Sequence, residues 1–223
     1  MSSIGVAIPC YKFHIPSLKR CLDSIEAQTV KPQEVIVACS SCKSSDIPFS
    51  SYNYSFTLRI LPRPERRNAA ENRNYAASFL TTDIITFFDA DDEMHPQRLE
   101  AITKAFQQHP SLDIVLHSFL EGEENNKPYE IHTSFDFKPQ SLQKSPTGCA
   151  VYKPNWGARI HHSQVSVSRF IYGRVQFKED PGNERREDAI FCGDILGMDN
   201  CQNVYIATPL SKYYIEGVTH PVA

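Results

Sequence analysis

The first half of the chain alternates between short apolar runs and segments with helical periodicity. Residues 4–9 and 34–39 are apolar and rich in β-branched side chains, as the strands of a buried sheet are. Between them, residues 16–29 place apolar side chains at helical spacing, and Pro16 stands near the start, where proline is tolerated. The pattern therefore predicts a strand, a helix and a second strand in succession.

The same alternation continues through the middle of the chain. A strand at about residues 57–61 leads into a helix at about residues 67–80, and residues 83–90 form a fourth strand that is apolar on both faces. A helix at about residues 96–108 and a fifth strand at residues 113–120 follow. Such alternation is typical of an α/β fold with a mainly parallel central sheet flanked by helices.

The periodicity fades between residues 121 and 155, where glycine, proline, asparagine, lysine and serine dominate. We interpret this region as an excursion or a mobile loop. Beyond it we expect a β-branched stretch at residues 164–177, a helix, and a last strand near residues 204–207. The residues expected on the buried face of that helix are Ala189, Ile190, Cys192, Gly193 and Leu196. The second half therefore extends the sheet of the first, and residues 1–223 are expected to form a single domain.

Composition limits the classes of function. The 223 residues are 41% hydrophobic, which is enough to fill the core of a soluble globular domain. The 23 basic and 26 acidic residues leave a formal charge of −3, which argues against nucleic-acid binding through bulk charge. The sequence has no apolar run long enough to span a membrane and no basic leader, so we expect a cytoplasmic protein.

Seven cysteines are scattered along the chain, which indicates reduced thiols. Cys39 and Cys42 form a CxxC pair, which leaves open a redox pair or half of a zinc site. No second CxxC motif and no histidine pair at metal-binding spacing accompanies it in the sequence. Reduced thiols are therefore the simpler interpretation.

Three carboxylates, Asp89, Asp91 and Asp92, come at the end of the fourth predicted strand. In open α/β sheets, ligands bind at the carboxyl ends of the strands. Side chains of an extended segment alternate, so Asp89 and Asp91 are expected to point the same way and to address one ligand. Paired carboxylates suit Mg²⁺ or Mn²⁺, whose coordination is completed by the phosphates of a substrate. The sequence therefore predicts a metal-dependent site for a diphosphate.

A structural explanation competes with the metal site. Asp92 is in a position to cap the helix that begins near Pro96, and the other two aspartates would then be solvated loop residues. Capping accounts for one carboxylate and leaves two beside an apolar strand. The metal site therefore explains more of the pattern.

Three stretches together resemble the family 2 glycosyltransferases, which have the GT-A fold. These stretches are VAIPCYKFHIPSLKRCLDSIEAQT, EVIVACSSCKSSD and ENRNYAASFLTTDIITFFDADDEMHPQRL. The resemblance covers about residues 4–108 and implies a GT-A type nucleotide-diphospho-sugar transferase fold. It implies transfer of a sugar from a UDP-linked donor to a hydroxyl of a glycan or another acceptor, with inversion and without processive synthesis. The cofactor would be Mn²⁺ or Mg²⁺.

The resemblance implies that the first half, residues 1–110, binds the nucleotide sugar. The loop after the first strand would pack beside the base, Asp89 would lie near the ribose, and Asp91 would bind the metal. The second strand of the family usually ends in acidic residues, where this chain has Ala38, Cys39 and Ser40. The expected nucleotide-sugar-binding residues are Pro9, Cys10, Tyr11, Ser40, Arg73, Asn74, Asp89, Ala90 and Asp91.

The second half, residues 111–223, would bind the acceptor and supply the catalytic base. The stretch RREDAIF resembles the Glu-Asp motif that opens a helix in this family, which assigns the base to Asp188 with Glu187 beside it. Acids also occur in a first helical turn because the helix dipole favours them there. His220 stands where many GT-A enzymes carry a late histidine and would join Asp91 and Asp89 as a metal ligand.

Two other functions stay open on the sequence alone. A nucleotidyltransferase also uses paired aspartates at a strand end, but it usually has a basic, glycine-rich loop at the first strand, and IPCYKFH is not glycine-rich. A catalytically inactive module that binds nucleotide sugars would retain the fold without turnover.

Overall fold

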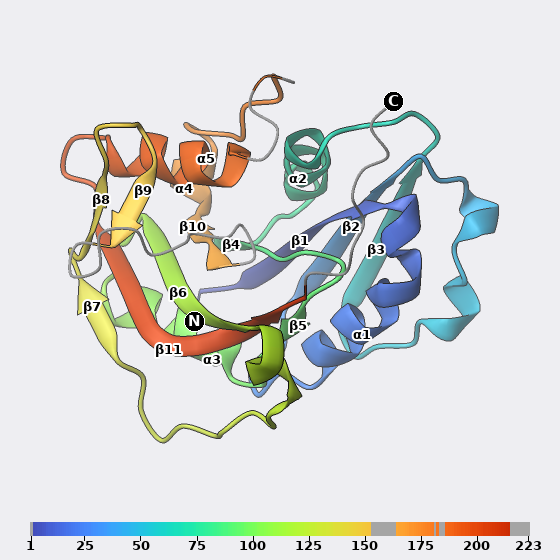
Figure 1. Cartoon of the computed structure of the whole chain (residues 1–223), viewed down its shortest axis with the longest axis horizontal. Helices are drawn as coiled ribbons and strands as arrows, with labels where there is room; N and C mark the ends of the chain where they lie inside the picture. The colour runs from blue at the N-terminus through green and yellow to red at the C-terminus, as the bar shows by residue number, and fades with distance from the viewer. Residues whose placement is uncertain (1, 153–163, 181, 183–185, 215–223) are drawn as a thin grey trace.

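The chain folds around a mixed nine-stranded sheet, which Figure 1 shows with helices on both of its faces. The structure is a computed structural model and describes residues 2–152, 164–180, 182 and 186–214. The strand order is β3-β2-β1-β4-β10-β6-β11-β5, and β7 pairs with β11 beside this path. A separate two-stranded sheet joins β8 to β9.

The strands and helices of the first half lie where the sequence predicts them, with ends that differ by a few residues. The strands are β1 (Ile4–Tyr11), β2 (Glu34–Ser40), β3 (Thr57–Arg63), β4 (Ile84–Phe87), β5 (Glu93–Met94), β6 (Ile114–Glu121), β7 (Phe137–Pro139), β8 (Leu142–Lys144), β9 (Ala150–Tyr152), β10 (Ser166–Ser168) and β11 (Asn203–Tyr213). The α-helices are α1 (Ile15–Glu26), α2 (Ala69–Ser78), α3 (Arg98–Gln108), α4 (Arg169–Tyr172) and α5 (Glu187–Leu196).

Strand β1 is the centre of the parallel part of the sheet. It pairs in parallel with β2 on one side and with β4 on the other, and β2 pairs in parallel with β3. The carboxyl ends of these strands therefore meet at one edge of the sheet, where α/β folds bind ligands. Strand β10 lies antiparallel between β4 and β6 and joins this part to the strands of the second half.

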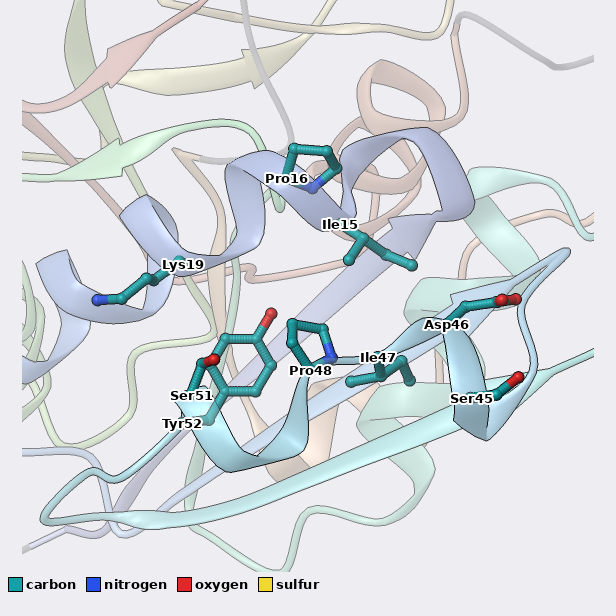
Figure 2. A pocket seen from close by; sticks show the side chains of 9 residues that line it. All are labelled: Ile15, Pro16, Lys19, Ser45, Asp46, Ile47, Pro48, Ser51 and Tyr52. Carbon is teal, nitrogen blue, oxygen red and sulfur yellow. The ribbon is translucent and has the colours of Figure 1, made fainter.

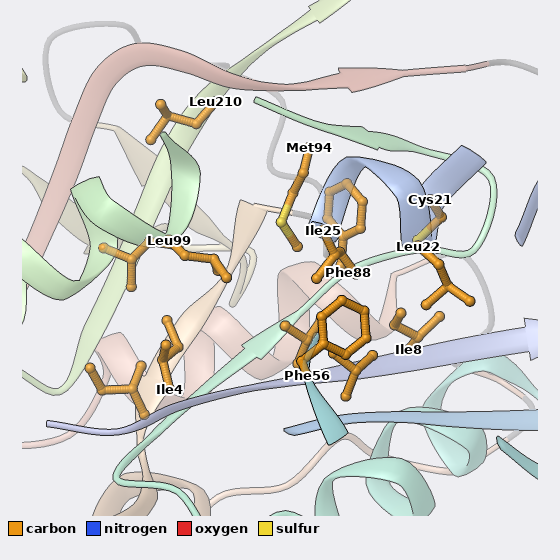
Figure 3. Packing of buried hydrophobic residues seen from close by; sticks show 14 of the residues in the cluster. Ile4, Ile8, Cys21, Leu22, Ile25, Phe56, Phe88, Met94, Leu99 and Leu210 are labelled. Carbon is orange, nitrogen blue, oxygen red and sulfur yellow. The ribbon is translucent and has the colours of Figure 1, made fainter. Parts of the chain in front are cut away.

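Two hydrophobic cores cover the two faces of the sheet. Alternate side chains of β1 face opposite sides, so Ile8 packs in the core that includes α1 and α3, whereas Ala7 packs in the core that includes α2 and α5. Figure 3 shows the first core, where Phe88 lies among Ile8 and Leu22. Because Phe88 is fully buried and directly precedes Asp89, core packing fixes the start of the acidic segment.

A buried arginine lies in the protein interior, close to the carboxyl end of β4. Arg98, in the first turn of α3, is fully buried, and its Nε donates a hydrogen bond of 2.8 Å to Nε2 of His117. A guanidinium only donates hydrogen bonds, so the proton of His117 lies on Nδ1, which donates to the carbonyl of Ser118 at 2.7 Å. Burial, together with the charge of Arg98, lowers the pKa of His117 well below its ordinary value.

The segment after β6 is more regular than the sequence predicts. It contains a 3-10 helix, Gly122–Asn126, and the strands β7, β8 and β9, so the expectation of an irregular excursion is wrong for the described residues up to 152. Polar side chains hold the middle of this segment. The side-chain amide of Gln97 donates to the carbonyl of His132 and accepts a hydrogen bond from its backbone N–H. Nε2 of His95 lies 2.9 Å from the carbonyl oxygen of Glu130. Polar hydrogen bonds therefore order this segment, which has none of the apolar periodicity from which the sequence analysis predicts helices and strands.

The predicted buried face of helix α5 is confirmed for Cys192 and Gly193 and wrong for the other three residues. Its buried residues are Glu187, Phe191, Cys192, Gly193 and Ile195, whereas Ala189, Ile190 and Leu196 are only half-buried. The buried Gly193 lies directly against the backbone of Gly148 in the turn between β8 and β9. Strand β11 also extends beyond the predicted residues 204–207, with register shifts around Pro209 that bend it along β6.

We expect Gly193→Ala to destabilise the protein by about 1–3 kcal/mol, the usual cost of overpacking. An added Cβ would lie 1.9 Å from the carbonyl oxygen of Gly148, so the helix or the hairpin has to move. Gly173→Ala is the matched control, because its Cβ would meet the nearest backbone oxygens at 3.5 Å, an ordinary contact. Urea unfolding measures both variants, and equal stabilities would refute the close packing of α5 on the hairpin.

The protein is expected to lose stability as the pH falls below about 6.5, the ordinary pKa of histidine. His117 stays neutral in the folded state and takes up a proton on unfolding, so the unfolded state binds more protons and acid favours it. Each such histidine contributes at most about 1.4 kcal/mol per pH unit. His117→Gln should flatten the fall in unfolding free energy between pH 7 and pH 5, measured with urea. An unchanged slope would contradict the assignment.

Candidate active site

The acidic segment after β4 is a turn rather than a continuation of the strand. Strand β4 ends at Phe87, and the backbone N–H of Asp92 donates to the carbonyl of Asp89 at 3.3 Å, which closes a turn at residues 90–91. We call residues 88–92 the carboxylate loop. The side chains of Asp89 and Asp91 are 14% and 18% exposed, whereas Asp92 is fully buried. The accessible pair is therefore the predicted one, although a turn presents it instead of an alternating strand.

Asp92 does not cap helix α3, so that part of the structural explanation is wrong. The N-cap of α3 is Gln97, whose side chain makes no capping hydrogen bond. The carboxylate of Asp92 instead accepts a hydrogen bond of 3.1 Å from the backbone N–H of Tyr214, just after β11. The turn directs Asp92 into the protein, where its bond to Tyr214 joins the carboxylate loop to the residue that follows β11.

Arg73 connects the carboxylate loop to helix α5. Its side chain is 2% exposed, with Nη2 lying 3.2 Å from Oδ1 of Asp89 and Nη1 lying 3.0 Å from Oε1 of Glu187. Burial disfavours the charge of Arg73, but the surrounding carboxylates, Asp89 and Glu187 first, raise its pKa above the ordinary value. The predicted donor-binding arginine is therefore a buried cation that holds two predicted site residues together.

Negative charge exceeds positive charge around Arg73. Burial raises the pKa of Asp89 to about 7, because the opposing attraction of Arg73 is weakened by repulsion from Asp91 and Glu187. Oε2 of Glu187 is buried and has no hydrogen-bond partner among the described residues. A further cation placed beside Asp89 and Asp91 would therefore be electrostatically favourable.

The donor set fits a metal ion that is shared with a substrate. In the described part of the chain, no three histidine, cysteine, aspartate or glutamate side chains gather as a protein-only metal cage. Mg²⁺ and Mn²⁺ are hard ions that prefer oxygen ligands, and Mg²⁺ is commonly bound by one or two carboxylates plus substrate phosphates. Asp91 and Asp89 match that arrangement. His220 lies outside the described residues, so its predicted role as a ligand is untested.

The residues predicted to surround the nucleotide form the ends of β1 and β2. Pro9, Cys10 and Ser40 are buried, whereas Tyr11 is partly exposed and packs edge-on against Phe13 with ring centroids 5.4 Å apart. Phe13 is 55% exposed, which leaves an aromatic surface beside the carboxyl end of β1. The buried residues therefore form the floor of the candidate site, and a bound molecule would contact the aromatic pair Tyr11 and Phe13.

Two asparagines flank Arg73 and hold different parts of the site. Asn72, which the sequence analysis missed, donates to Oγ of Ser40 at 2.9 Å and to the carbonyl of Cys10 at 3.4 Å, so it joins the ends of β1 and β2. Asn74 instead donates to the carbonyl of Phe177 at 2.8 Å and accepts from its N–H at 3.1 Å. The structure therefore holds Asn74 against Phe177, and its predicted contact with the donor stays a prediction.

The two acids at the start of α5 have different environments. Glu187 is 8% exposed and is bound to Arg73. Asp188 is half-buried, and its Oδ1 accepts a hydrogen bond of 2.7 Å from the N–H of Ala189. Glu187 is therefore held as part of the buried charge cluster, and Asp188 is the more accessible acid.

Two nitrogen-bearing side chains from the start of the chain also reach Asp91, and the sequence analysis missed both. Nε2 of His14 lies 4.0 Å from Oδ2 of Asp91, and Nη2 of Arg20 donates to the Asp91 carbonyl. His14 is the N-cap of helix α1, and Arg20 lies within that helix. Their only sequence signal is that they stand near the end of the first strand, which is also where the predicted site lies.

A shallow cavity of about 460 Å³ adjoins the site (Figure 2). It lies between the start of α1, at Ile15 and Pro16, and the loop that carries Asp46 and Tyr52. Asp46 is 3.7 Å from Lys12, which follows the partly exposed Tyr11. The lining of the cavity includes neither the aromatic pair Tyr11 and Phe13 nor any residue of the carboxylate loop.

Comparisons with known proteins agree with this arrangement. The family model described as glycosyl transferase family 2 matches residues 5–182. An uncharacterized glycosyltransferase of Haemophilus influenzae is 28% identical over 116 residues, which are 51% of this chain and 38% of that protein. The amylovoran biosynthesis glycosyltransferase AmsB of Erwinia amylovora is 22% identical over 224 residues, covering 96% of this chain and 70% of that protein.

Solved structures of Staphylococcus aureus TarS share the fold. TarS residues 1–349 in complex with UDP superpose with a TM-score of 0.64 at 13% identity, over 95% of this chain and 60% of that one. A complex of the same fragment with UDP-GlcNAc gives the same TM-score over 58% of its length. This chain thus spans less than two thirds of these structures. The predicted GT-A type fold is confirmed, and the chain belongs to glycosyl transferase family 2.

Proposed function

We propose that the chain transfers a sugar from a UDP-linked donor to an acceptor hydroxyl, with the help of Mg²⁺ or Mn²⁺. The observation that carries the proposal is the buried link through Arg73, which joins the accessible pair Asp89 and Asp91 to the acids that open α5. One end of this link suits a metal-bound diphosphate, and the other suits a base for the attacking hydroxyl. Family membership supports glycosyl transfer, and the TarS complexes support a UDP-linked donor.

The first half of the chain provides the donor side of this reaction. Asp91, with Asp89 beside it, would hold the metal ion, whose positive charge stabilises the negative charge that develops on the nucleoside diphosphate. The exposed aromatic surface of Tyr11 and Phe13 offers apolar area to the nucleotide. Asn72 holds the floor beneath it by joining Ser40 to the backbone of Cys10.

Asp188 is the residue that we assign as the catalytic base. Its carboxylate takes the proton of the acceptor hydroxyl while the hydroxyl oxygen attacks the anomeric carbon from the side opposite the diphosphate. The bond from that carbon to the phosphate oxygen breaks, the nucleoside diphosphate leaves, and the carbon is inverted. Glu187 is less suited to this role, because its Oε1 is bound to Arg73. Arg73 thereby positions the start of α5, and with it Asp188, relative to Asp89.

The proposal also states that the enzyme adds one sugar at a time and does not synthesise a polymer processively. The described residues contain no helix that is long and apolar enough to cross a membrane. The acceptor is a glycan or another molecule with a free hydroxyl, and a cytoplasmic location stays a prediction. A panel of nucleotide sugars assayed for metal-dependent release of the nucleoside diphosphate tests the whole function, with water or a glycan mixture as acceptor.

Asp91→Asn is expected to weaken Mn²⁺-dependent UDP binding by at least about 10-fold, since a ligand contributes no less than the outer groups that support it. The amide keeps the shape of the side chain but removes the charge that attracts the ion. Calorimetry with UDP and Mn²⁺ measures the change. Asp136→Asn is the control, because Asp136 is 57% exposed and pairs with Lys138 outside the site. Equal UDP affinities in the two variants would exclude Asp91 as a ligand.

Asp188→Asn should lower turnover by about 10²- to 10⁴-fold while UDP affinity stays nearly unchanged, because a base acts only when the acceptor attacks. Glu187→Gln should instead lower the free energy of unfolding, since it weakens the bond to Arg73. Steady-state rates and urea unfolding of both variants separate the roles. If Glu187→Gln abolished turnover at normal stability while Asp188→Asn did not, the assignment of the base would move to Glu187.

Arg73→Met is expected to destabilise the protein by about 3–5 kcal/mol, because it leaves buried carboxylates without their cation. Adding Glu187→Gln to this variant should recover part of the loss, since it removes one of the uncompensated charges. Urea unfolding of the wild type, the two single variants and the double variant gives the coupling energy. Strictly additive losses would show that the link between the carboxylate loop and α5 carries no energy.

A further inference from the structure

We propose that Arg20 and Tyr214 form a clamp that positions Asp91 for the metal ion and the diphosphate. The inference rests on the proposed function and adds two positioning residues to it. Neither residue belongs to the sites predicted from the sequence. They come from opposite ends of the chain, Arg20 from the middle of α1 and Tyr214 from the end of β11.

Arg20 holds the backbone of Asp91. Its Nη2 donates a hydrogen bond to the Asp91 carbonyl, across 71 residues of sequence. Because residues 90–91 form a turn, this carbonyl lies outside the hydrogen-bond ladder of the sheet. The bond therefore restrains the peptide plane after Asp91, and with it the direction in which the Asp91 side chain leaves the backbone.

Tyr214 supports Arg20 and the far side of the loop at the same time. The guanidinium of Arg20 lies 4.0 Å from the centroid of the Tyr214 ring, a cation–π distance. The Tyr214 N–H donates to Oδ1 of Asp92 at 3.1 Å, and its hydroxyl lies 3.1 Å from Oε2 of Glu93. Tyr214 thus contacts the two residues that follow Asp91 and the cation that holds its carbonyl.

With the clamp, the carboxylate loop is held by one arginine near each of its ends. Arg73, from α2, holds the side chain of Asp89 at the start of the loop. Arg20, from α1, holds the backbone of Asp91 toward its end. Two guanidinium groups therefore fix Asp89 and Asp91 relative to each other, and the carboxylate of Asp91 itself faces Nε2 of His14 at 4.0 Å.

Strand pairing makes the clamp part of the sheet. Ser211 and Lys212 of β11 pair with Met94 and Glu93 of β5, directly after the loop. Tyr214 directly follows β11, so this pairing holds it close to the carboxylate loop, where its N–H bonds Asp92. A positioning role follows, because Arg20 bonds the carbonyl of Asp91 and Tyr214 contacts Asp92 and Glu93, so neither has to touch the ion.

The test compares UDP binding with Mn²⁺ and with EDTA, measured by calorimetry, in Arg20→Met and Arg20→Lys. Outer groups that orient a metal ligand typically contribute about 10- to 100-fold in metal affinity, and we expect Arg20→Met to lose about that much of the Mn²⁺-dependent gain. Affinity in EDTA should stay unchanged. Lysine keeps a donor for the carbonyl but lacks the planar stack, so Arg20→Lys should recover part of the gain. Arg59→Met is the matched control, since Arg59 also stacks on a ring, Phe79 at 4.9 Å, on edge strand β3.

Two further measurements separate positioning from general stability. Amide exchange of residues 88–94 without ligand should quicken in Arg20→Met, whereas exchange in β1 and β2 should not change. Tyr214→Leu should reduce the Mn²⁺-dependent gain as well, and the two effects should be less than additive, because both variants remove the stack of Arg20 on Tyr214. If Arg20→Met does not fold, Arg20→Lys against Arg59→Met carries the comparison.

Each contrary result has a distinct meaning. A wild type that shows no Mn²⁺-dependent UDP binding overturns the proposed function and this inference with it. A wild type that binds, with Arg20→Met equal to Arg59→Met, overturns the clamp alone. An equal loss of UDP affinity with Mn²⁺ and with EDTA would make Arg20 a direct ligand of the nucleotide, which also refutes a positioning role.

Discussion

The buried guanidinium of Arg73 is the interaction on which the site depends. A buried charge is tolerated only when opposite charges and hydrogen bonds surround it, and Asp89 and Glu187 provide these from segments almost 100 residues apart. Neither carboxylate could be buried to the same extent without the arginine. The donor side and the base side of the site are therefore held in one geometry by a single cation, which a fold built only from apolar contacts would not require.

The sequence predicts the first half of the fold well, because its elements bury regular apolar faces. Strands β1, β2 and β4 are continuous apolar runs, and α1 has a clear helical stripe. Local pattern fails where polar side chains determine the structure. The segment after β6 is held by Gln97 and His95 rather than by apolar periodicity, and α5 buries the charged Glu187, which is paired with Arg73.

Some residues of the candidate site were likewise predicted from the sequence, and others were missed. Its acids were found because the resemblance and the strand end both pointed to Asp89 and Asp91, and the motif pointed to Asp188. Asn72 and Arg20 were not predicted, because they act only across distances that the chain closes in three dimensions. For Asn72 the available signal was the polar, weakly amphipathic helix at residues 69–78, since a helix without a large apolar face still buries Asn72 and Arg73.

Strand β10 has a consequence for the order in which the chain assembles. It is only three residues long, yet it lies between β4 and β6, which do not pair with each other. The parallel strands can therefore pair once the first 90 residues are present, but β6 cannot join them until residues 166–168 have arrived. Contacts of such long range are slow to form. During synthesis, the apolar edge of β4 stays open until more than two thirds of the chain has emerged, which makes it the exposed edge that a chaperone would meet.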